Sequence, residues 1–558
     1  METNIPNRTE PRDIFTPERI ARAMLAFLWL GLAARAVRYG LRFPLWEDEC
    51  FLCVNFIDRS FAELLQPLTY HQVAPPLFLW LERAAVLLLG YSEWSLRLIP
   101  FLASLASLFL FRRLARNFLD GPGQLLAFGI FAVAYPGIRY AAEAKQYATD
   151  LFAALLLLTM AAEWYRTRRP AWLATLALIA APILWLSYPA AFVAGGVSLA
   201  IGATLILPLA RQYFSKQAAN DINPPRPIAI GGWIVFNIAI LIGFGSLMLI
   251  IRRQSGAELG FMTDYWREAF PPLSNPLQLI IWFFTVHTSE LLAWPIGGAR
   301  GASAFTAILF VIGLWQLLKT RNLFWSLLIL GPLGLNFIAA MLERYPYGGH
   351  MKFSMYFGPA VCLLAGCGAA TWNARTARNR PRLARRAAIG TAAALALIAC
   401  ASITRDVLHP YKTQSDERAR AFAQWFWFNA EAEAAVTVVD RHAGKLFSPA
   451  AHSELTWTAM FLCNRAIYAP KAPPEMPATK ERLRCLVYRD PRFEFREQAR
   501  DAWLAEMRVR HELVARVTFP FTRYGKNEED FVTVDYLDLY TFQPRETEMA
   551  RGETTTRQ

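Results

Sequence analysis

The sequence predicts a polytopic helical membrane protein that ends in a smaller α/β domain. Three observations support this fold class. Apolar runs of about 18–22 residues, the length that crosses a bilayer, recur from residue 20 to residue 404. Arg and Lys collect in the short segments between these runs. Beyond about residue 405, charged residues interrupt the apolar ones throughout. We therefore divide the chain into a transmembrane region, 1–404, an extracytoplasmic α/β domain, 405–545, and a polar tail expected to be disordered, 546–558.

Composition and the distribution of charge indicate whether the partner is nucleic acid or a lipid bilayer. The chain has 558 residues, of which 55% are hydrophobic, and a net charge of +14. Such a charge would suit nucleic acid, but these basic residues lie between apolar segments, where they set membrane orientation. The pattern indicates a lipid bilayer and no nucleic acid. The first apolar segment, 20–41, is interpreted as an uncleaved span whose Arg35 and Arg38 reach the outer interface.

The order of apolar segments and basic clusters predicts the topology. If the segment 76–90 crossed the membrane, the basic cluster at 112–116 would lie outside and every later cluster would be inverted. This segment opens with Pro75-Pro76 and contains Glu82 and Arg83, so we interpret it as an interfacial helix on the outer face. Eleven spans then place the N-terminus inside and everything after about 404 outside. These spans are 20–41, 96–111, 122–138, 148–164, 171–187, 189–210, 229–251, 302–318, 322–342, 353–372 and 386–404.

The first outer loop holds three consecutive carboxylates, Glu47, Asp48 and Glu49. Ionised carboxylates are costly in hydrocarbon, so these must lie at or outside the bilayer surface. There they can take a proton or hold a metal ion, although a solvated acidic loop is the alternative. His71 and Gln72 precede two prolines that mark a helix start, and they could face a polar head group.

The second outer loop alternates basic and aromatic groups. It contains Arg139, Glu143, Lys145 and Tyr147 between two predicted spans. Cations at this height suit the phosphate of a lipid in the outer leaflet. The alternative is that Tyr and Arg only anchor the protein at the interface.

The third outer loop is a turn shaped by one proline and two glycines between apolar spans. It carries Arg344, Tyr345, His350 and Lys352. Three of these side chains can be cationic, so the turn is a second candidate for binding an anionic head group. A simple surface turn is the alternative.

The C-terminal region has the pattern of a small α/β domain. A helix is expected to start at Ser415-Asp416-Glu417, and strands are expected at 435–439, 483–488, 513–521 and 531–542. Cys463 and Cys485 could pair if this region is extracytoplasmic. Cys50 and Cys53 have the C-x-x-C spacing but no second pair, so a zinc site is not expected there.

The order of these motifs resembles the C-type glycosyltransferase superfamily. The resemblance is closest to the protein O-mannosyltransferase-like family that includes bacterial aminoarabinose transferases acting on lipid A. It covers about 20–370. The matching elements are Asp48-Glu49 in the first outer loop, then Ala74-Pro75-Pro76-Leu77-Phe78, and then the stretch from Gly90 through Glu93 to Arg97-Leu98. The sequence departs from several relatives by offering Glu143 where they use Asp.

The resemblance implies a polyprenyl-phosphate-linked sugar as donor and an active site on the outer face of the bacterial cytoplasmic membrane. It implies that Asp48 is the catalytic base of an inverting transfer to a hydroxyl of a glycan, lipid or protein acceptor. Glu49 or Glu143 would orient the acceptor or hold a divalent ion, which is possible but not required. The leaving phosphate would be bound by some of Arg139, Lys145, Arg344, His350 and Lys352.

Two other functions fit a helical membrane protein of this composition. A transporter or flippase would carry charges in mid-span, often near broken helices, whereas most strong charges here lie at span ends. A non-catalytic protein that binds a sugar-lipid would share the fold and differ only in activity.

Overall fold

The computed structural model describes residues 16–214, 227–254, 266–297, 304–428, 436–438, 452–468, 483–489, 494–522 and 534–545. The chain forms two compact units. We call the first, residues 1–41, 60–85 and 97–408, the membrane bundle. We call the second, residues 42–59, 86–96 and 409–558, the sheet unit. Two pieces of the predicted first outer loop thus belong with the C-terminal region, an association that sequence order does not suggest.

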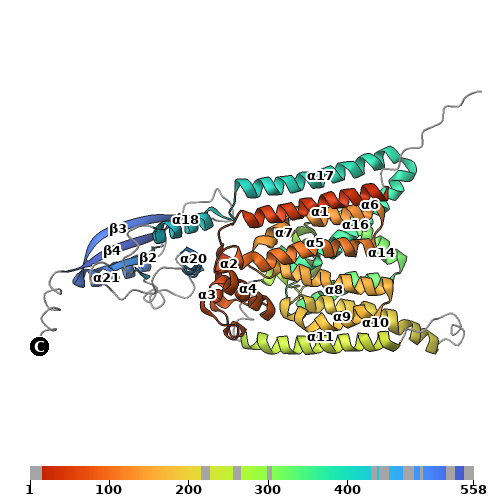
Figure 1. Ribbon diagram of the computed structural model, residues 1–558, viewed down its shortest axis with the longest axis horizontal. Coiled ribbons are helices and arrows are strands. Elements are labelled where there is room, and N and C mark those ends of the chain that lie inside the picture. Colours follow the sequence, from red (N-terminus) through yellow and green to blue (C-terminus); the bar gives the residue numbers. More distant parts are fainter. Residues whose placement is uncertain are drawn as a thin grey trace, which may run out of the picture. The chain divides into compact units, whose positions relative to one another are not determined.

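The membrane bundle consists of long apolar helices. Among the described residues, eight helices are long and apolar enough to cross a membrane, or nine if the bent pair at 121–142 counts as one span. Helices α1, α5, α8, α9 and α11 run side by side in Figure 1. The bounds are α1 Pro17–Gly40, α5 Leu98–Phe118, α6 Gly121–Val133, α7 Tyr135–Arg139, α8 Tyr147–Thr167, α9 Pro170–Leu186, α10 Ala190–Phe214, α11 Pro227–Gln254, α13 Pro276–Val286, α14 Ala304–Thr320, α15 Leu323–Met341, α16 Gly358–Asn379 and α17 Pro381–Leu408.

The fold class predicted from the sequence, a multi-pass helical membrane protein with a small C-terminal sheet, is confirmed. The count of eleven spans stays a prediction. Helices α9 and α14 coincide with two predicted spans, but each has 17 residues and is shorter than the eight full-length helices. Helix α4, Pro76–Leu89, has 14 residues, or about 21 Å, which is short of the hydrocarbon thickness. That length is the one expected of a helix that does not cross.

Close packing in the bundle depends on small residues. Helices α14 and α16 meet at Gly313 and Gly368, where a Cβ on either glycine would overlap a backbone carbonyl of the other helix. Small residues let helix backbones approach in this way where no hydrophobic effect drives association. Larger side chains at either position would separate the two helices.

Two arginines of α1 are interior structural groups. Arg35 is fully buried and donates hydrogen bonds to Ser104 Oγ at 2.8 Å and to the Ala132 carbonyl at 2.8 Å. Arg38 pairs with Asp406 of α17 at 2.6 Å, with both side chains buried. The prediction that these arginines reach the outer interface is therefore wrong. Polar groups on neighbouring helices hold them inside the bundle, although Arg35 Nη2 has no hydrogen-bond partner among the described residues.

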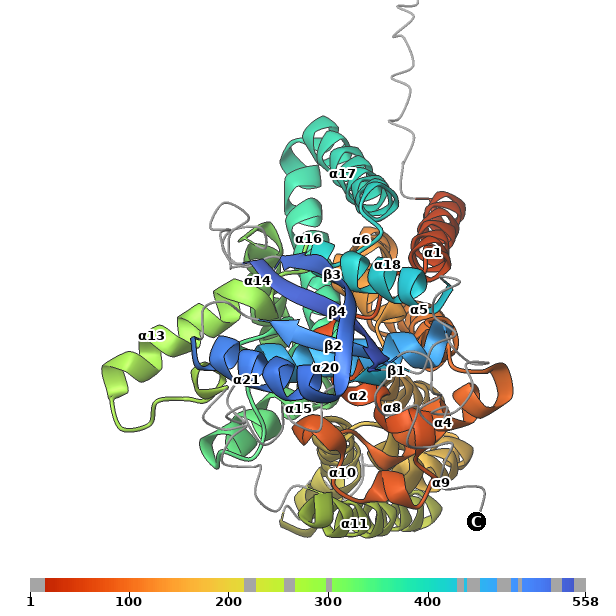
Figure 2. The same ribbon diagram turned by 90° about the vertical axis from the view of Figure 1, so that its left-hand side faces the viewer.

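The sheet unit contains one four-stranded sheet in the order β1-β2-β4-β3. The strands are β1 Val436–Val438, β2 Leu483–Arg489, β3 His511–Thr522 and β4 Val534–Pro544. The β1–β2 pair is parallel and the other two pairs are antiparallel. Figure 2 shows β2, β4 and β3 lying next to one another. All four coincide with strands expected from the sequence, although 531–533 lie outside the described residues, as does the tail 546–558.

Helices complete the sheet unit. They are α2 Glu47–Cys53, α3 Asn55–Asp58, α18 Gln414–Phe428, α20 His452–Tyr468 and α21 Glu494–Arg510. Leu504 of α21 packs on Cys485, Tyr540 and Phe542 of the sheet, so this helix covers one face. Cys463 instead donates to the Cys50 carbonyl at 3.6 Å, and both Cys463 and Cys485 are free thiols. The predicted pairing of Cys463 with Cys485 is wrong because the two lie in different packing environments.

Candidate active site

The second outer loop folds into a short buried segment between α7 and α8. Lys145 N donates to the Glu143 carbonyl at 2.7 Å, which closes a tight turn just before α8 begins. Glu143 and Lys145 are each only 4% exposed. Tyr147 is also buried, with its ring 5.0 Å from that of Tyr140. Buried side chains cannot anchor the protein in the lipid interface, so the anchoring alternative fails for these residues.

Lys145 is held by Gln72 from the loop that precedes α4. The Lys145 ammonium donates to Gln72 Oε1 at 2.7 Å, across 73 positions of sequence. Gln72 Nε2 in turn donates to the Tyr70 carbonyl at 3.0 Å. Tyr70 and His71 both have left-handed backbone conformations, with φ of 58° and 54°. Such strain in non-glycine residues persists where the surroundings demand it, and here it aims the Gln72 amide oxygen at Lys145.

Glu143 has a long and incomplete pairing. Its carboxylate lies 3.6 Å from Arg139 Nε. Neither carboxylate oxygen has a hydrogen-bond partner among the described residues. The Arg139 guanidinium also lies 5.2 Å from the centre of the Tyr140 ring. A buried carboxylate of this kind can accept a hydrogen bond from a ligand, because the fold uses little of its capacity.

The third outer loop contains a turn that requires two glycines and packs against Val286 and His287. Gly348 and Gly349 have φ of 73° and 71°, and a Cβ on Gly348 would overlap Val286. The Tyr347 hydroxyl lies 3.1 Å from His287 Nε2, while His287 Nδ1 lies 2.7 Å from the Phe283 carbonyl. Burial lowers the pKa of His287, which favours the neutral ring. Nδ1 then donates to the carbonyl, and Nε2 accepts from Tyr347.

The cations of this turn have different environments. Lys352 Nζ lies 4.3 Å from the centre of the Trp266 ring, and the His350 ring lies 6.1 Å from the same ring. His350 Nδ1 accepts from Lys352 N at 3.2 Å. Arg344 is exposed. The Tyr345 ring contacts Phe192 of α10 and Phe353, with centroids 5.4 and 6.5 Å away, and Lys352 Nζ lies 5.4 Å from the centre of the Phe353 ring. Lys352 and His350 are therefore gathered on an aromatic wall, and Arg344 is not part of that group.

The first-loop carboxylates form the first turn of α2 in the sheet unit. Glu49 is 1% exposed, and its Oε2 accepts from Trp46 N at 3.3 Å. It therefore caps the helix, where negative charge is favoured. Glu47 and Asp48 are half-buried. Of the two predicted catalytic carboxylates of the loop, Glu49 has the structural task, and Asp48 is the better candidate for a base.

Asp416 is a buried carboxyl that the sequence identified only as a helix start. Its Oδ2 accepts from Thr413 N at 2.9 Å as α18 begins. Burial raises its pKa to about 7, and the negative charge of Glu49 acts in the same direction. The neighbouring Lys412 ammonium lies over the Trp46 ring. The starts of α2 and α18 therefore form one polar cluster within the sheet unit.

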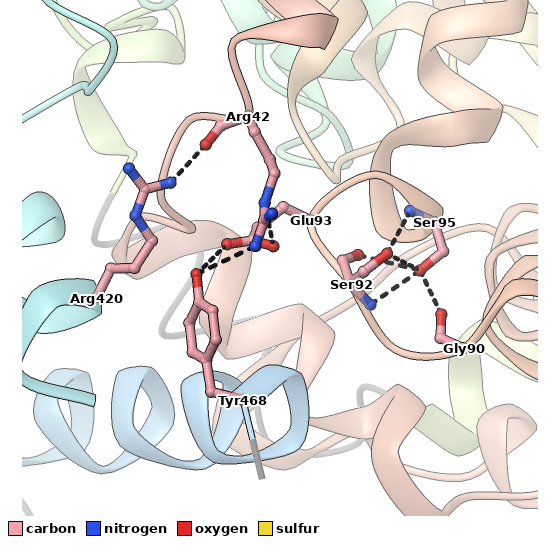
Figure 3. Close-up of polar contacts among 7 residues, drawn as sticks. All are labelled: Arg42, Gly90, Ser92, Glu93, Ser95, Arg420 and Tyr468. Carbon is pink, nitrogen blue, oxygen red and sulfur yellow. Dashed lines mark hydrogen bonds and ion pairs between the residues drawn. The ribbon is translucent and has the colours of Figure 1, made fainter. Parts of the chain in front are cut away.

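Glu93, part of the Gly90–Leu98 motif, is a structural group (Figure 3). It is 1% exposed, with Oε2 3.1 Å from Arg42 Nε and Oε1 accepting from the Tyr468 hydroxyl at 2.8 Å. Arg420 donates to the Arg42 carbonyl at 2.6 Å. Ser95 Oγ donates to the Gly90 carbonyl at 2.6 Å and closes the turn beside it. Nothing in the local sequence signalled this role, since its partners come from distant segments.

The structure thus brings together some predicted site residues. Gln72 lies with Lys145, Arg139 with Glu143, and His350 with Lys352. Asp48 and Glu49 belong to the sheet unit and the other candidates to the membrane bundle. Within the described part of the chain, no three His, Cys, Asp or Glu side chains form a group that could hold a metal ion. Metal binding by Asp48, Glu49 and Glu143 stays a prediction, and we derive no step through a metal.

Comparisons with known proteins find similarity in structure. No protein-family model and no curated protein matches the sequence. ArnT from Cupriavidus metallidurans, solved bound to undecaprenyl phosphate, is 12% identical over 92% of this chain and 97% of its own, with a TM-score of 0.49. An Archaeoglobus fulgidus oligosaccharyltransferase, solved with Zn and sulfate, is 11% identical over 82% of this chain and 67% of its own, with a TM-score of 0.43.

The archaeal oligosaccharyltransferase AglB was also solved with an inhibitory peptide and a dolichol-phosphate. It is 12% identical over 73% of this chain and 58% of its own, with a TM-score of 0.40. The chain thus spans about two thirds or less of the archaeal enzymes and nearly the whole of ArnT. The roles of single residues therefore depend on this chain's own geometry.

Proposed function

We propose that this protein transfers a sugar from a polyprenyl-phosphate-linked donor to an acceptor hydroxyl at the outer face of a bacterial cytoplasmic membrane. The observation that carries the proposal is the buried Lys145 ammonium, oriented by Gln72 at the start of a membrane-length helix. A lipid phosphate lies at the ends of membrane spans, where this cation can meet it. A buried, hydrogen-bonded ammonium is a far stronger partner for phosphate than a solvated one.

The proposed transfer inverts the anomeric carbon. The acceptor oxygen attacks that carbon from the face opposite the phosphate, and the bond between the carbon and the phosphate oxygen breaks. The bonding electrons leave with the polyprenyl phosphate, whose charge Lys145 balances. Asp48 takes the acceptor proton, and Glu143 orients the acceptor with its unused oxygens. Arg139, His350, Lys352 and Arg344 supply further positive charge, with the exposed Arg344 contributing least.

The test is sugar transfer by purified variants in lipid nanodiscs. Mass spectrometry of lipids and surface polymers with and without the protein first identifies donor and acceptor. Asp48→Asn should then lower turnover by about 10²–10⁴-fold while donor binding is retained, because the amide cannot accept the proton. Glu49→Gln should lower turnover less and reduce stability, since Glu49 caps α2. Glu47→Gln is the matched control and should be near normal.

Two outcomes would contradict the proposal. Near-normal turnover in both Asp48→Asn and Glu49→Gln would remove the acidic triplet from the mechanism. A wild-type protein that binds the donor but leaves the sugar–phosphate bond intact would be a binding protein or transporter instead.

A further inference from the structure

A second buried carboxyl in the bundle has no assigned role. Asp150 is the fourth residue of α8 and is 4% exposed. Its Oδ1 has no hydrogen-bond partner among the described residues. An ionisable side chain within a membrane span is costly and is retained where it serves a function. Asp150 therefore requires an explanation that the packing of α8 does not supply.

The neighbours of Asp150 come from four separate helix ends. Ser187 and Tyr188 lie in the connection between α9 and α10, and Asp150 is beside both of them. Tyr345 follows α15, Tyr356 precedes α16, and both lie within the electrostatic reach of the Asp150 carboxyl. We call Asp150, Ser187, Tyr188, Tyr345 and Tyr356 the Asp150 cluster.

The polar atoms of this cluster are buried and incompletely paired. Ser187 is within hydrogen-bonding reach of the Asp150 carboxyl, and Tyr356 of Asn336, whereas Asp150 Oδ1 and Tyr188 OH have no hydrogen-bond partner among the described residues. Buried polar groups are nearly always paired, so unpaired ones in one place indicate an absent ligand. The Gln146 side-chain oxygen is also unpaired, one helical turn before Asp150 on the same face of α8.

The side chains of the Asp150 cluster indicate which class of ligand it can bind. It offers one carboxyl, several hydroxyls and aromatic rings, and no Lys or Arg side chain belongs to it. Phe192 adds a further ring, 5.4 Å from that of Tyr345 and 6.3 Å from that of Tyr356. Such a surface lacks the cation that a phosphate needs and has a single carboxylate, too few for a metal ion. A monosaccharide complements this surface, because it carries hydroxyl groups on a compact ring.

We propose that the Asp150 cluster binds the sugar ring of the lipid-linked donor through its hydroxyls. This inference rests on the proposed function and assigns the sugar and the phosphate to neighbouring places. Lys145 precedes α8 by two residues, and Asp150 lies about 5 Å further along the helix axis than the helix start. A phosphate at Lys145 would place the attached sugar within reach of Asp150.

The test compares two lipids in the full-length protein. Dissociation constants are measured in nanodiscs for undecaprenyl phosphate and for a panel of undecaprenyl-phosphoryl hexoses and pentoses. The wild type should bind at least one sugar-bearing lipid more tightly than undecaprenyl phosphate. Asp150→Asn should reduce that preference about tenfold, and Tyr188→Phe and Tyr345→Phe about threefold each, while undecaprenyl phosphate binds as before.

The control is Tyr165→Phe. Tyr165 lies at the other end of α8 with its ring stacked 3.9 Å from that of Phe324, so its variant should match the wild type for both lipids. The two Tyr→Phe changes in the cluster keep the aromatic packing, and they carry the test if Asp150→Asn does not fold.

The outcomes separate this inference from the proposed function. A wild-type preference that all three cluster variants retain would overturn the inference alone. Equal binding of every panel lipid and undecaprenyl phosphate would also overturn it. Failure of the wild type to bind any of these lipids would overturn the proposed function together with it.

Discussion

Buried carboxylates are treated differently in the two units. In the sheet unit, both oxygens of Glu93 are engaged, by Arg42 at 3.1 Å and by the Tyr468 hydroxyl at 2.8 Å. At the start of α8 in the membrane bundle, Glu143 has only a 3.6 Å contact with Arg139, and Asp150 Oδ1 has no partner among the described residues. Both kinds of site involve the cost of removing a carboxylate from water. Partners within the folded chain offset that cost for Glu93 more completely than for Glu143 and Asp150.

Whether a buried charge is paired depends on its role and not on the unit in which it lies. The bundle also contains a buried ion pair, because Arg38 contacts Asp406 Oδ1 at 2.6 Å, although Asp406 Oδ2 has no hydrogen-bond partner among the described residues. A paired buried charge is therefore expected to affect folding, whereas an unpaired one is expected to affect ligand binding or turnover. Variants of each kind test this distinction.

The largest expected effect is on stability, from Asp406→Ala. This change leaves the buried Arg38 without its carboxylate, which should lower the free energy of unfolding by about 3–5 kcal/mol. Unfolding in mixed micelles measures it. Arg405→Ala, an exposed neighbour on α17, is the control and should change stability little. Loss of sugar transfer in an Asp406→Ala protein of normal stability would break the comparison.

Lys145→Met should have the next largest effect, on donor binding. The variant loses a buried ammonium, and the dissociation constant of undecaprenyl phosphate should rise by roughly 10–100-fold with little change in stability. Arg344→Ala removes an exposed cation from the third outer loop and should stay within about threefold. Equal effects of Lys145→Met and Arg344→Ala on this dissociation constant would mean that a buried cation contributes no more to phosphate binding than an exposed one.

Glu143→Gln and Glu93→Gln form the direct comparison. Glu93→Gln should lower the free energy of unfolding by about 1–3 kcal/mol, because it removes the charge that pairs with Arg42, and should leave turnover of the folded protein unchanged. Glu143→Gln should lower turnover and leave the free energy of unfolding nearly unchanged. The measurements are unfolding curves and single-turnover transfer rates on the same preparations. Parallel loss of stability and turnover in both variants would show that pairing does not separate the two roles.

A pH dependence of stability is expected from Asp416, and it is comparable in size to the effect of Glu93→Gln. Burial raises the pKa of this carboxyl to about 7 in the folded chain, against about 4 when unfolded. The folded state therefore holds the proton more strongly, and stability should fall by about 2 kcal/mol as pH rises from 5 to 7. Asp416→Asn keeps the cap of α18 and should flatten that part of the profile. An unchanged slope in the variant would assign the pH dependence to other groups.

Much of the fold could be predicted because its signals are local. The lengths of apolar runs predicted the long helices. Short apolar runs predicted β1 and β2, and alternating residues predicted β3 and β4. Glu143, Lys145 and Gln72 were recognised as candidates because they are polar residues flanking apolar spans. Asp150 was missed since a single acid in the first turn of a helix is an ordinary pattern.

Local sequence patterns identified which segments are long and apolar enough to enter a membrane, which segments form the sheet and which loops are rich in charge. The partner of each charge followed from tertiary packing. Gln72 meets Lys145 across 73 positions, and Glu93 meets Tyr468 across 375. Arg35, expected at the interface, is enclosed by Ser104 and the Ala132 carbonyl. Hydrophobic length and periodicity are properties of one segment, whereas the partner of a buried charge depends on how distant segments pack.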